Sequence, residues 1–139
     1  VVLVSKQPQA VWGEAICLDA YTLSGPRPFP LAAGDTLHIR LVWHSLHPIP
    51  ADLTVSLQLL DGESQLRAQT DRPPRGGLAP TSSWEVNSRI EDRYALPIPH
   101  DLPPGTYRLV VILYDPETKA RWLLSSGEDA FLLSTLQVE

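Results

Sequence analysis

The feature that most constrains the fold is a two-residue alternation of apolar and polar side chains in short runs. It is clearest in residues 36–45, where the apolar positions are Leu37, Ile39, Leu41 and Trp43. A β-strand directs successive side chains to opposite faces, so this period indicates a strand with one buried face. No stretch long enough for a packed helix shows the 3.6-residue period, so we expect helices of at most single turns.

Similar runs predict the other strands, and turn residues separate them. Most of the fourteen prolines and eight glycines fall between the apolar runs, as residues that end strands do. The expected strands cover residues 14–23, 36–45, 53–61, 65–71, 90–98, 106–115, 121–124 and 131–138, with a further short strand opening at Trp84 and Val86. We therefore predict an all-β fold, a two-sheet antiparallel β-sandwich of the Ig-like or jelly-roll-like kind, with about seven to nine strands.

Two segments differ from the general pattern. Residues 106–115 carry apolar side chains on both faces, so we expect a central strand that is covered on both sides for part of its length. Residues 72–83 contain three prolines and two glycines, too many breakers for a regular element, and predict a long loop. Any function that belongs to this domain itself is expected near that loop.

Size and charge restrict the classes of protein to consider. A chain of 139 residues with 43% hydrophobic residues has the size and composition of one globular domain, so residues 1–139 are expected to form a single sandwich. The net charge of −5 argues against nucleic acid as a partner, because nucleic-acid binding normally needs a basic face. No apolar run reaches the roughly 18 to 20 residues that span a bilayer, so this segment is not expected to insert into a membrane. The chain has no methionine and begins at Val1, so we expect a piece of a longer protein.

The residues that carry chemistry form no recognisable catalytic pattern. Cys17 is the one cysteine, which excludes an intrachain disulfide, and no His or Lys lies near it in sequence to activate the thiol. We expect Cys17 to be a small buried residue and the four histidines to be exposed. No Gly-x-Ser-x-Gly elbow, phosphate-binding glycine loop or Asp-x-Asp-x-Asp calcium ladder occurs. We therefore expect no catalytic residue, no enzyme activity, no metal site and no cofactor.

The candidate ligand-binding residues are an aromatic side chain beside the long loop and polar residues of nearby strands. Aromatic rings suit the apolar faces of pyranose sugars, and the chain has four tryptophans and four tyrosines. Trp43 alternates with polar residues and is expected in the core, whereas Trp84 either pins the long loop to the sandwich or lies exposed. The candidate ligand-binding residues are Trp84, Asp71, Asp92 and Tyr94.

Several short motifs share turn prolines, glycines and aromatic residues and follow one another between residues 34 and 122. The most specific of them are Thr81-Ser82-Ser83-Trp84, Asp92-Arg93-Tyr94 and Pro104-Gly105. Together they resemble the extracytoplasmic β-sandwich region at the C-terminal end of large bacterial multi-spanning membrane proteins, many of which look like glycosyltransferases that use lipid-linked sugars. One departure is Asn87-Ser88, where a glycine turn is expected after the tryptophan.

The resemblance implies an extracytoplasmic domain that is attached to the membrane through its parent protein. In such proteins the catalytic acids lie in loops of the membrane domain, so this chain is expected to be a non-catalytic accessory domain for interaction or substrate positioning. Its expected partner is a glycan or the membrane domain of the same parent. Two alternatives remain: a carbohydrate-binding module with Trp84 and neighbouring aromatics as its platform, and a structural Ig-like spacer. A sugar-binding module of this kind needs at least two coplanar, exposed aromatic rings.

Overall fold

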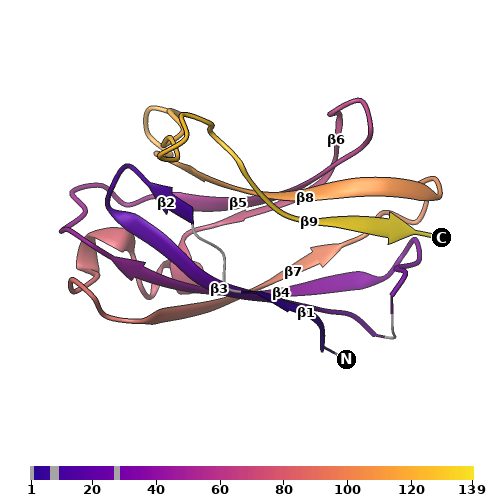
Figure 1. Cartoon of the computed structure of the whole chain (residues 1–139), viewed down its shortest axis with the longest axis horizontal. Helices are drawn as coiled ribbons and strands as arrows, with labels where there is room; N and C mark the ends of the chain where they lie inside the picture. Colours follow the sequence, from indigo (N-terminus) through magenta and orange to yellow (C-terminus); the bar gives the residue numbers. More distant parts are fainter. Residues whose placement is uncertain (1, 7–9, 27–28) are drawn as a thin grey trace.

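The chain forms two antiparallel β-sheets packed face to face, as seen in a computed structural model that describes residues 2–6, 10–26 and 29–139, with side chains from residue 10 onward (Figure 1). The first sheet contains β1 (Val2–Lys6), β2 (Ala10–Trp12), β3 (Ile16–Ser24), β4 (Thr36–Ser45) and β7 (Ile90–Pro97). The second sheet contains β5 (Thr54–Leu60), β6 (Leu66–Arg72), β8 (Gly105–Tyr114) and β9 (Phe131–Val138). The predicted all-β sandwich is confirmed.

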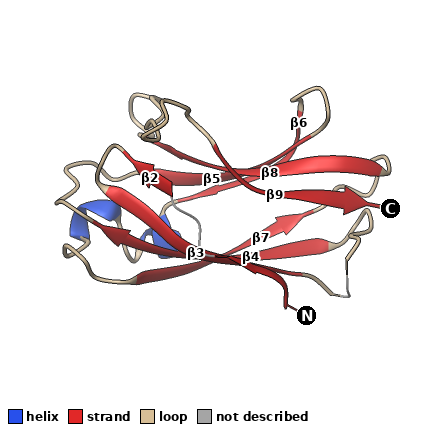
Figure 2. Cartoon of the chain, viewed as in Figure 1, coloured by secondary structure: helices blue, strands red, loops and turns tan. Residues whose placement is uncertain are grey.

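The order of strands differs from their order in sequence, because the chain crosses between the sheets three times. In the first sheet β7 pairs with β4, β4 with β3, and β3 with both β1 and β2 along its other side. In the second sheet the order is β6, β5, β8, β9. The crossings follow β4, β6 and β7. The last strands of each sheet are therefore β7 and β6 on one side, and β1, β2 and β9 on the other (Figures 1 and 2).

The core lies between the sheets and is built from the alternating apolar positions. The inward side chains of β4 are Leu37, Ile39, Leu41 and Trp43, and all four are fully buried, as predicted. Burying one such side chain contributes about 1.5–3 kcal/mol to folding. The Tyr21 hydroxyl donates a hydrogen bond across the core to the backbone carbonyl of a β9 residue, so a polar contact also joins the two sheets.

Strand β8 is central and covered on both faces, as predicted. It lies between β5 and β9, and its inward side chains, such as Leu109 and Val111, belong to the core. On the outer face of the same strand, Val110 and Ile112 are also buried. On that outer face Val110 stands opposite Gln58 of β5 and Leu132 of β9, so side chains of both neighbouring strands flank it.

The N-terminal part of the chain differs from the prediction. The first run was expected to begin at residue 14, but Glu14 lies in a turn between β2 and β3, strands that pair with each other. Gly13 and Glu14 both have positive φ, 57° and 56°, and the Ala15 amide donates to the Trp12 carbonyl at 2.9 Å. These two dihedrals are those of a type I′ turn, whose twist matches that of the strands, and the whole connection has three residues because Trp12 pairs with Ile16. A strand of three residues is too short to show a period.

The predictions of two short strands are also wrong. The segment after Trp84 is a turn, in which Asn87 has a φ of 66° and its amide donates to the Ser45 carbonyl at 2.8 Å. Asn enters this left-handed region more readily than most residues, so it serves where a glycine was expected. Between β8 and β9, Arg121 and Leu124 form only isolated bridges.

The long loop is ordered by specific contacts and contains two short 3₁₀ turns, η1 (Pro74–Gly77) and η2 (Thr81–Ser83). The buried Thr81 hydroxyl accepts the Leu53 amide at 3.0 Å and donates to the Ala51 carbonyl at 2.5 Å. The loop is therefore anchored to the segment that leads into β5. Among the described residues, no helix is long and apolar enough to cross a membrane (Figure 2).

Candidate functional site

A sandwich of open sheets has two edges at which the last strand of one sheet faces the last strand of the other. Here one edge is formed by β6 and β7, and we call it the β6–β7 edge. The other is formed by β2 and β9, which approach each other through the rings of Trp12 and Phe131, and we call it the β2–β9 edge. The sequence-predicted residues Asp92 and Tyr94 lie on β7, so the β6–β7 edge is described first.

Asp92 joins the long loop to β7. Its carboxylate is 4% exposed and accepts hydrogen bonds from the Arg75 amide at 2.8 Å, the Arg93 amide at 2.8 Å and the Arg72 guanidinium at 3.2 Å. A buried carboxylate needs such donors, because an unpaired charge away from water is strongly unfavourable. Asp92 therefore holds Arg75, which has a positive φ of 52°, in a fixed position above the strand.

Tyr94 lies beneath Arg72 and completes the closure of this edge. The Arg72 guanidinium carbon is 4.6 Å from the centre of the Tyr94 ring, the geometry of a cation–π contact. The same guanidinium also donates to the Arg93 carbonyl. The Tyr94 hydroxyl is buried and has no hydrogen-bond partner of normal geometry among the described residues, and burial together with the nearby Asp92 carboxylate raises its pKa. Tyr94 therefore remains a neutral phenol.

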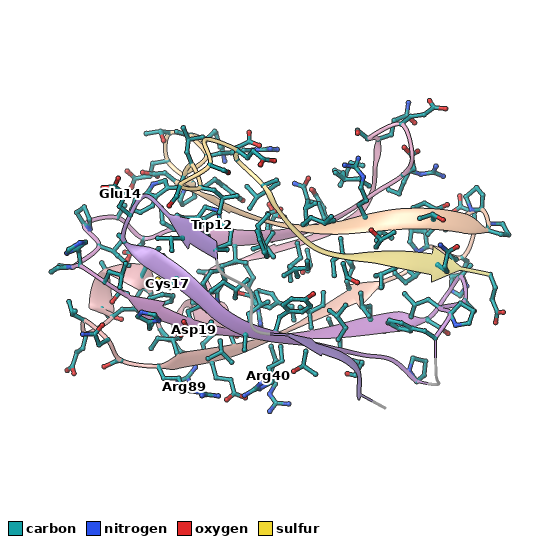
Figure 3. The ribbon with its side chains drawn as sticks, in the orientation of Figure 1. Trp12, Glu14, Cys17, Asp19, Arg40 and Arg89 are labelled. Atoms are coloured by element: carbon teal, nitrogen blue, oxygen red, sulfur yellow. The ribbon has the colours of Figure 1, made fainter. Side chains whose placement is uncertain are left out.

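An arginine cluster surrounds these two residues. We define it as Arg40 on β4, Arg72 on β6, Arg75 in the long loop, and Arg89 and Arg93 at or beside β7. Figure 3 shows Arg40 and Arg89 near each other on the side of the first sheet that faces away from the second. Five guanidinium groups here face two carboxylates, Glu91 and Asp92, which leaves an excess of three positive charges on a chain of net charge −5.

Glu91 is shared among three members of the arginine cluster. Arg40 donates two hydrogen bonds to its carboxylate, at 2.6 and 3.0 Å, and Arg93 and Arg89 lie at 3.3 and 3.9 Å. The hydrogen bonds from Arg40, together with the charges of Arg40, Arg93 and Arg89, lower the Glu91 pKa to about 2. Arg40 and Arg93 stand opposite each other in the β4–β7 register, and the Glu91 carboxylate, which contacts both, offsets the repulsion of this like-charge pair.

Two recesses border the arginine cluster, and Arg93, whose side chain is 77% exposed, lines both. The first has a volume of about 440 Å³ and is lined by Arg72, Arg75, Glu91, Asp92 and Arg93. The second, of about 520 Å³, adds the polar side chains of Thr22, Ser24 and His38 beside Arg40 and Tyr94. Guanidinium groups bind carboxylates, sulfates and phosphates through paired N–H donors, so these recesses suit an anionic group.

The four sequence-predicted residues do not form one site. Asp92 and Tyr94 come together at the β6–β7 edge, but Asp71 lies on the outer face of the second sheet. There its carboxylate accepts from the Ser56 hydroxyl at 2.7 Å and from the Tyr114 hydroxyl at 2.9 Å. Neighbouring residues of a strand point to opposite faces, so Asp71 points outward while Arg72 reaches the β6–β7 edge.

Trp84 lies in the core and not on the surface. It is 6% exposed, its indole N–H donates to the Ala79 carbonyl at 2.8 Å, and its ring centre is 6.4 Å from that of Trp43. Trp84 thus pins the long loop to the sandwich, and it presents no free ring face on which a sugar could stack. Trp12 and Trp43 are fully buried as well.

The arginine cluster was not predicted from the sequence, although one signal was present. Arg89, Glu91 and Arg93 alternate along one face of the segment that enters β7. The net charge of −5 is a sum over the whole chain, and it concealed this local excess of positive charge. Arg40 could not have been joined to the group, because the β4–β7 pairing is not visible in the sequence.

A third group of residues combines a thiol, an imidazole and a carboxylate on the outer face of the first sheet. The β3–β4 register places Cys17 opposite His44, whose Nδ1 atom is 2.7–2.8 Å from both carboxylate oxygens of Asp19. Cys17 is only half-buried, contrary to expectation. Burial and the Asp19 charge raise the pKa of its thiol, whereas a nucleophilic cysteine needs a lowered pKa. In the part of the chain with described side chains, no three His, Cys, Asp or Glu residues gather as a metal ion requires.

Comparison with known proteins agrees with the fold. No protein-family model and no curated protein matches the chain. Among solved structures, the C-terminal domain of wzt matches with a TM-score of 0.59 at 14% identity, over 98% of this chain and 77% of that one. A β-glucuronidase of Bacteroides uniformis matches with a TM-score of 0.53 at 16% identity, over 76% of this chain but only 12% of the enzyme.

At these identities the matches show a shared β-sandwich fold. Neither structure is named as a multi-spanning membrane protein. The parent protein and the extracytoplasmic location that the sequence resemblance implies therefore stay predictions.

Proposed function

We propose that this chain is a non-catalytic carbohydrate-binding domain whose arginine cluster binds saccharides that carry acid groups. The observation that carries the proposal is the local excess of three positive charges on a chain of net charge −5. Such an excess opposes folding through repulsion between like charges, and a bound anion would relieve that repulsion.

Two features favour a saccharide over a simple anion. The recess beside Arg40 and Arg93 also contains Thr22, Ser24 and His38, whose polar groups can exchange hydrogen bonds with sugar hydroxyls. One of the two similar sandwiches described above belongs to an enzyme that is named for a sugar acid. Because the likeness concerns the fold, it serves here to choose which ligands to test first.

The proposed role is accessory. The chain spans about 12% of the β-glucuronidase, so that enzyme's reaction is not transferred to it. The neutral thiol of Cys17 also lacks the activation that nucleophilic catalysis needs. In a longer protein that acts on polysaccharides, such a domain would hold an acidic chain near its partner domain, outside the cytoplasm.

Titration calorimetry tests this proposal with oligogalacturonate as the acidic ligand and a dextran oligosaccharide of similar length as the neutral one. Arg93→Gln removes one exposed guanidinium that lines both recesses, and we expect it to weaken oligogalacturonate binding about tenfold or more. Raising the salt concentration should weaken binding by the wild-type chain as well.

Arg108→Gln provides the matched control, because Arg108 lies on β8 of the other sheet and donates to the Ser64 hydroxyl. Arg108→Gln should bind oligogalacturonate as tightly as the wild-type chain does. Equal affinities of Arg93→Gln and the wild-type chain would overturn the proposed site. Equal affinity for a single-stranded oligonucleotide would mean that the cluster attracts anions in general and does not recognise saccharides.

A further inference from the structure

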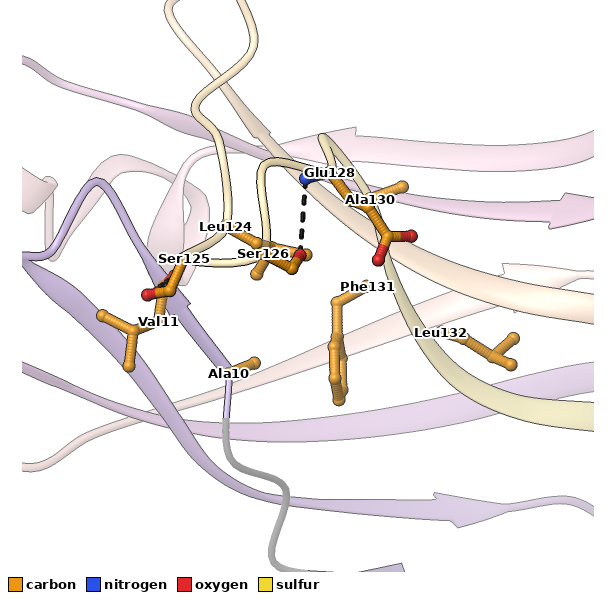
Figure 4. A pocket seen from close by; sticks show the side chains of 9 residues that line it. All are labelled: Ala10, Val11, Leu124, Ser125, Ser126, Glu128, Ala130, Phe131 and Leu132. Carbon is orange, nitrogen blue, oxygen red and sulfur yellow. Dashed lines mark hydrogen bonds between the residues drawn. The ribbon is translucent and has the colours of Figure 1, made fainter.

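The β2–β9 edge contains a recess of about 380 Å³ that the proposed function does not use (Figure 4). It opens between β2, the turn at residues 124–128 and the start of β9. Its apolar lining includes Phe131 and Leu132, and its polar lining includes Ser125, Ser126 and Glu128. The volume falls in the range of about 300–1,000 Å³ that small-molecule sites usually have.

The walls of this recess are held by backbone hydrogen bonds. The Ser125 amide donates to the Val11 carbonyl at 3.1 Å, which joins the turn to β2. Within the turn, the Leu124 amide donates to the Glu128 carbonyl and the Gly127 amide to the Leu124 carbonyl, both at 2.8 Å. Gly127 has a φ of 91°, a conformation that favours glycine. The recess is therefore formed before a ligand arrives, which lowers the entropic cost of binding.

The aromatic wall is fixed by the core. Phe131 is half-buried, and its ring lies 6.2 Å from the ring of Trp12 at an interplanar angle of 75°. Trp12 is fully buried against Trp43, with ring centres 5.5 Å apart. Phe131 is thus supported from behind by two tryptophans while part of it lines the recess. Leu132, the next residue of β9, pairs with Val110 on the outer face of the sheet, is 48% exposed and lines the rim of the recess.

The polar wall offers hydrogen-bond acceptors and donors without positive charge. Glu128 is exposed, and its carboxylate makes no hydrogen bond or ion pair with the described side chains. The Ser126 hydroxyl accepts the Glu128 amide at 3.4 Å and keeps its own proton available. Figure 4 shows the Glu128 carboxylate and the Phe131 ring together at the entry to β9.

From this geometry we infer that the recess at the β2–β9 edge is a second ligand site, and that its ligand is an uncharged sugar ring. The apolar C–H face of a pyranose would pack on the exposed part of the Phe131 ring, and its hydroxyls would donate to Glu128. The free carboxylate repels acid groups, so this site and the arginine cluster select sugars of opposite character. The inference does not depend on the arginine cluster, which lies at the other edge of the sandwich.

Backbone amide NMR of the whole chain tests the inference, with methyl β-glucoside and maltotriose as neutral probes. We expect both sugars to shift the amide signals of Ser126, Glu128 and Phe131 at millimolar concentration. Glu128→Gln alters only an exposed group and should weaken binding about tenfold. Phe131→Leu keeps an apolar side chain but removes the ring, and should weaken binding about fivefold.

Glu117→Gln is the matched control, since Glu117 is an exposed acid in the turn after β8 and lines neither site. It should leave the sugar-induced shifts unchanged, and so should Arg93→Gln. If Arg93→Gln abolished the shifts, the neutral sugar would be binding at the arginine cluster and the second site would be refuted.

Two further outcomes would also overturn the inference. One is that neither sugar shifts the signals of the recess. The other is that hexanol shifts them while the sugars do not, which would identify the recess as an apolar patch. Because Glu128→Gln leaves the core untouched, a folding defect in Phe131→Leu would not prevent a decision.

Discussion

At the β6–β7 edge the space between the sheets is closed by charged groups, whereas at the β2–β9 edge it is closed by aromatic rings. Asp92 and Arg72 join the long loop, β6 and β7 through hydrogen bonds and a cation–π contact. Trp12 and Phe131 join β2 and β9 through ring packing. Both kinds of edge closure exclude water from the core, but they leave different groups at the surface.

The difference shows how the closure of an edge determines what the edge can bind. Charged closure requires donors around a buried carboxylate, which here are the Arg72 guanidinium and two backbone amides, and further arginines gather around Glu91 at the neighbouring surface. Aromatic closure hides most of its rings and leaves part of Phe131 beside the Glu128 carboxylate, which pairs with none of the described side chains. Four substitutions distinguish the two kinds of closure, taken here from the largest expected loss of stability to the smallest.

Trp12→Ala should be the most damaging change. It removes a fully buried indole from beneath Phe131 and beside Trp43, which leaves a cavity, so we expect a loss of about 3–5 kcal/mol in the free energy of unfolding. Urea denaturation followed by circular dichroism measures this loss. Leu123→Ala, at an exposed position of the same region, should change stability by less than about 0.5 kcal/mol. A loss below about 1 kcal/mol for Trp12→Ala would show that aromatic packing does not close this edge.

Asp92→Ala should rank second, with a loss of about 2–3 kcal/mol, because it leaves the Arg75 and Arg93 amides without their acceptor. Asp92→Asn should lose less, since it keeps one oxygen as an acceptor. The same denaturation experiment measures both. Proteolysis should in addition cut the long loop of Asp92→Ala faster than that of the wild-type chain. A loop that stayed equally resistant would show that other contacts hold it.

Glu91→Gln should have a smaller effect that depends on pH. The pKa of Glu91 is lowered to about 2 from an ordinary value of 4.5, so its charge stabilises the folded chain above about pH 4.5, and this contribution disappears as the pH falls toward 2. The difference in denaturation midpoint between the wild-type chain and Glu91→Gln should shrink over that range. In an Arg40→Gln background the pH dependence should be weaker, because the main hydrogen-bond donor to Glu91 is gone. An unchanged pH dependence in that background would contradict the assignment to Arg40.

Tyr94→Phe should have the smallest effect, within about 0.5 kcal/mol, because the buried hydroxyl that it removes has no hydrogen-bond partner of normal geometry among the described residues. The ring remains in place beneath Arg72. Thermal unfolding is sufficient to measure the change. A loss above about 1 kcal/mol would reveal a hydrogen bond from the Tyr94 hydroxyl to the neighbouring Asp92 carboxylate.

The elements of the fold were largely predictable, and the errors have local causes. The strand expected at residues 36–45 has those bounds, and the one at 131–138 likewise. Long alternating runs are reliable because one whole face must be buried. The three-residue β2 was missed, and the segment after Trp84 was misread, because a few apolar residues fit a strand and a turn equally well.

The candidate site was predictable only in part. Asp92 and Tyr94 were selected from the sequence and do lie at the β6–β7 edge. Trp84 shows what the sequence could not predict, because its sequence context allowed either an exposed platform or a loop anchor. In the structure Trp84 is a loop anchor, because Trp43 supplies a ring contact and Ala79 a hydrogen-bond acceptor for its indole.

The sequence by itself determined the period of two, the positions of most turns and the buried face of each long strand, because these follow from the local geometry of a strand. Only the tertiary structure decided which strands lie at the edges, and hence where the arginine cluster and the second recess are found. Arg40 meets Glu91 across 51 positions of sequence, and Trp12 meets Phe131 from opposite ends of the chain. Such contacts depend on the order of strands in each sheet, which arises from packing the whole chain.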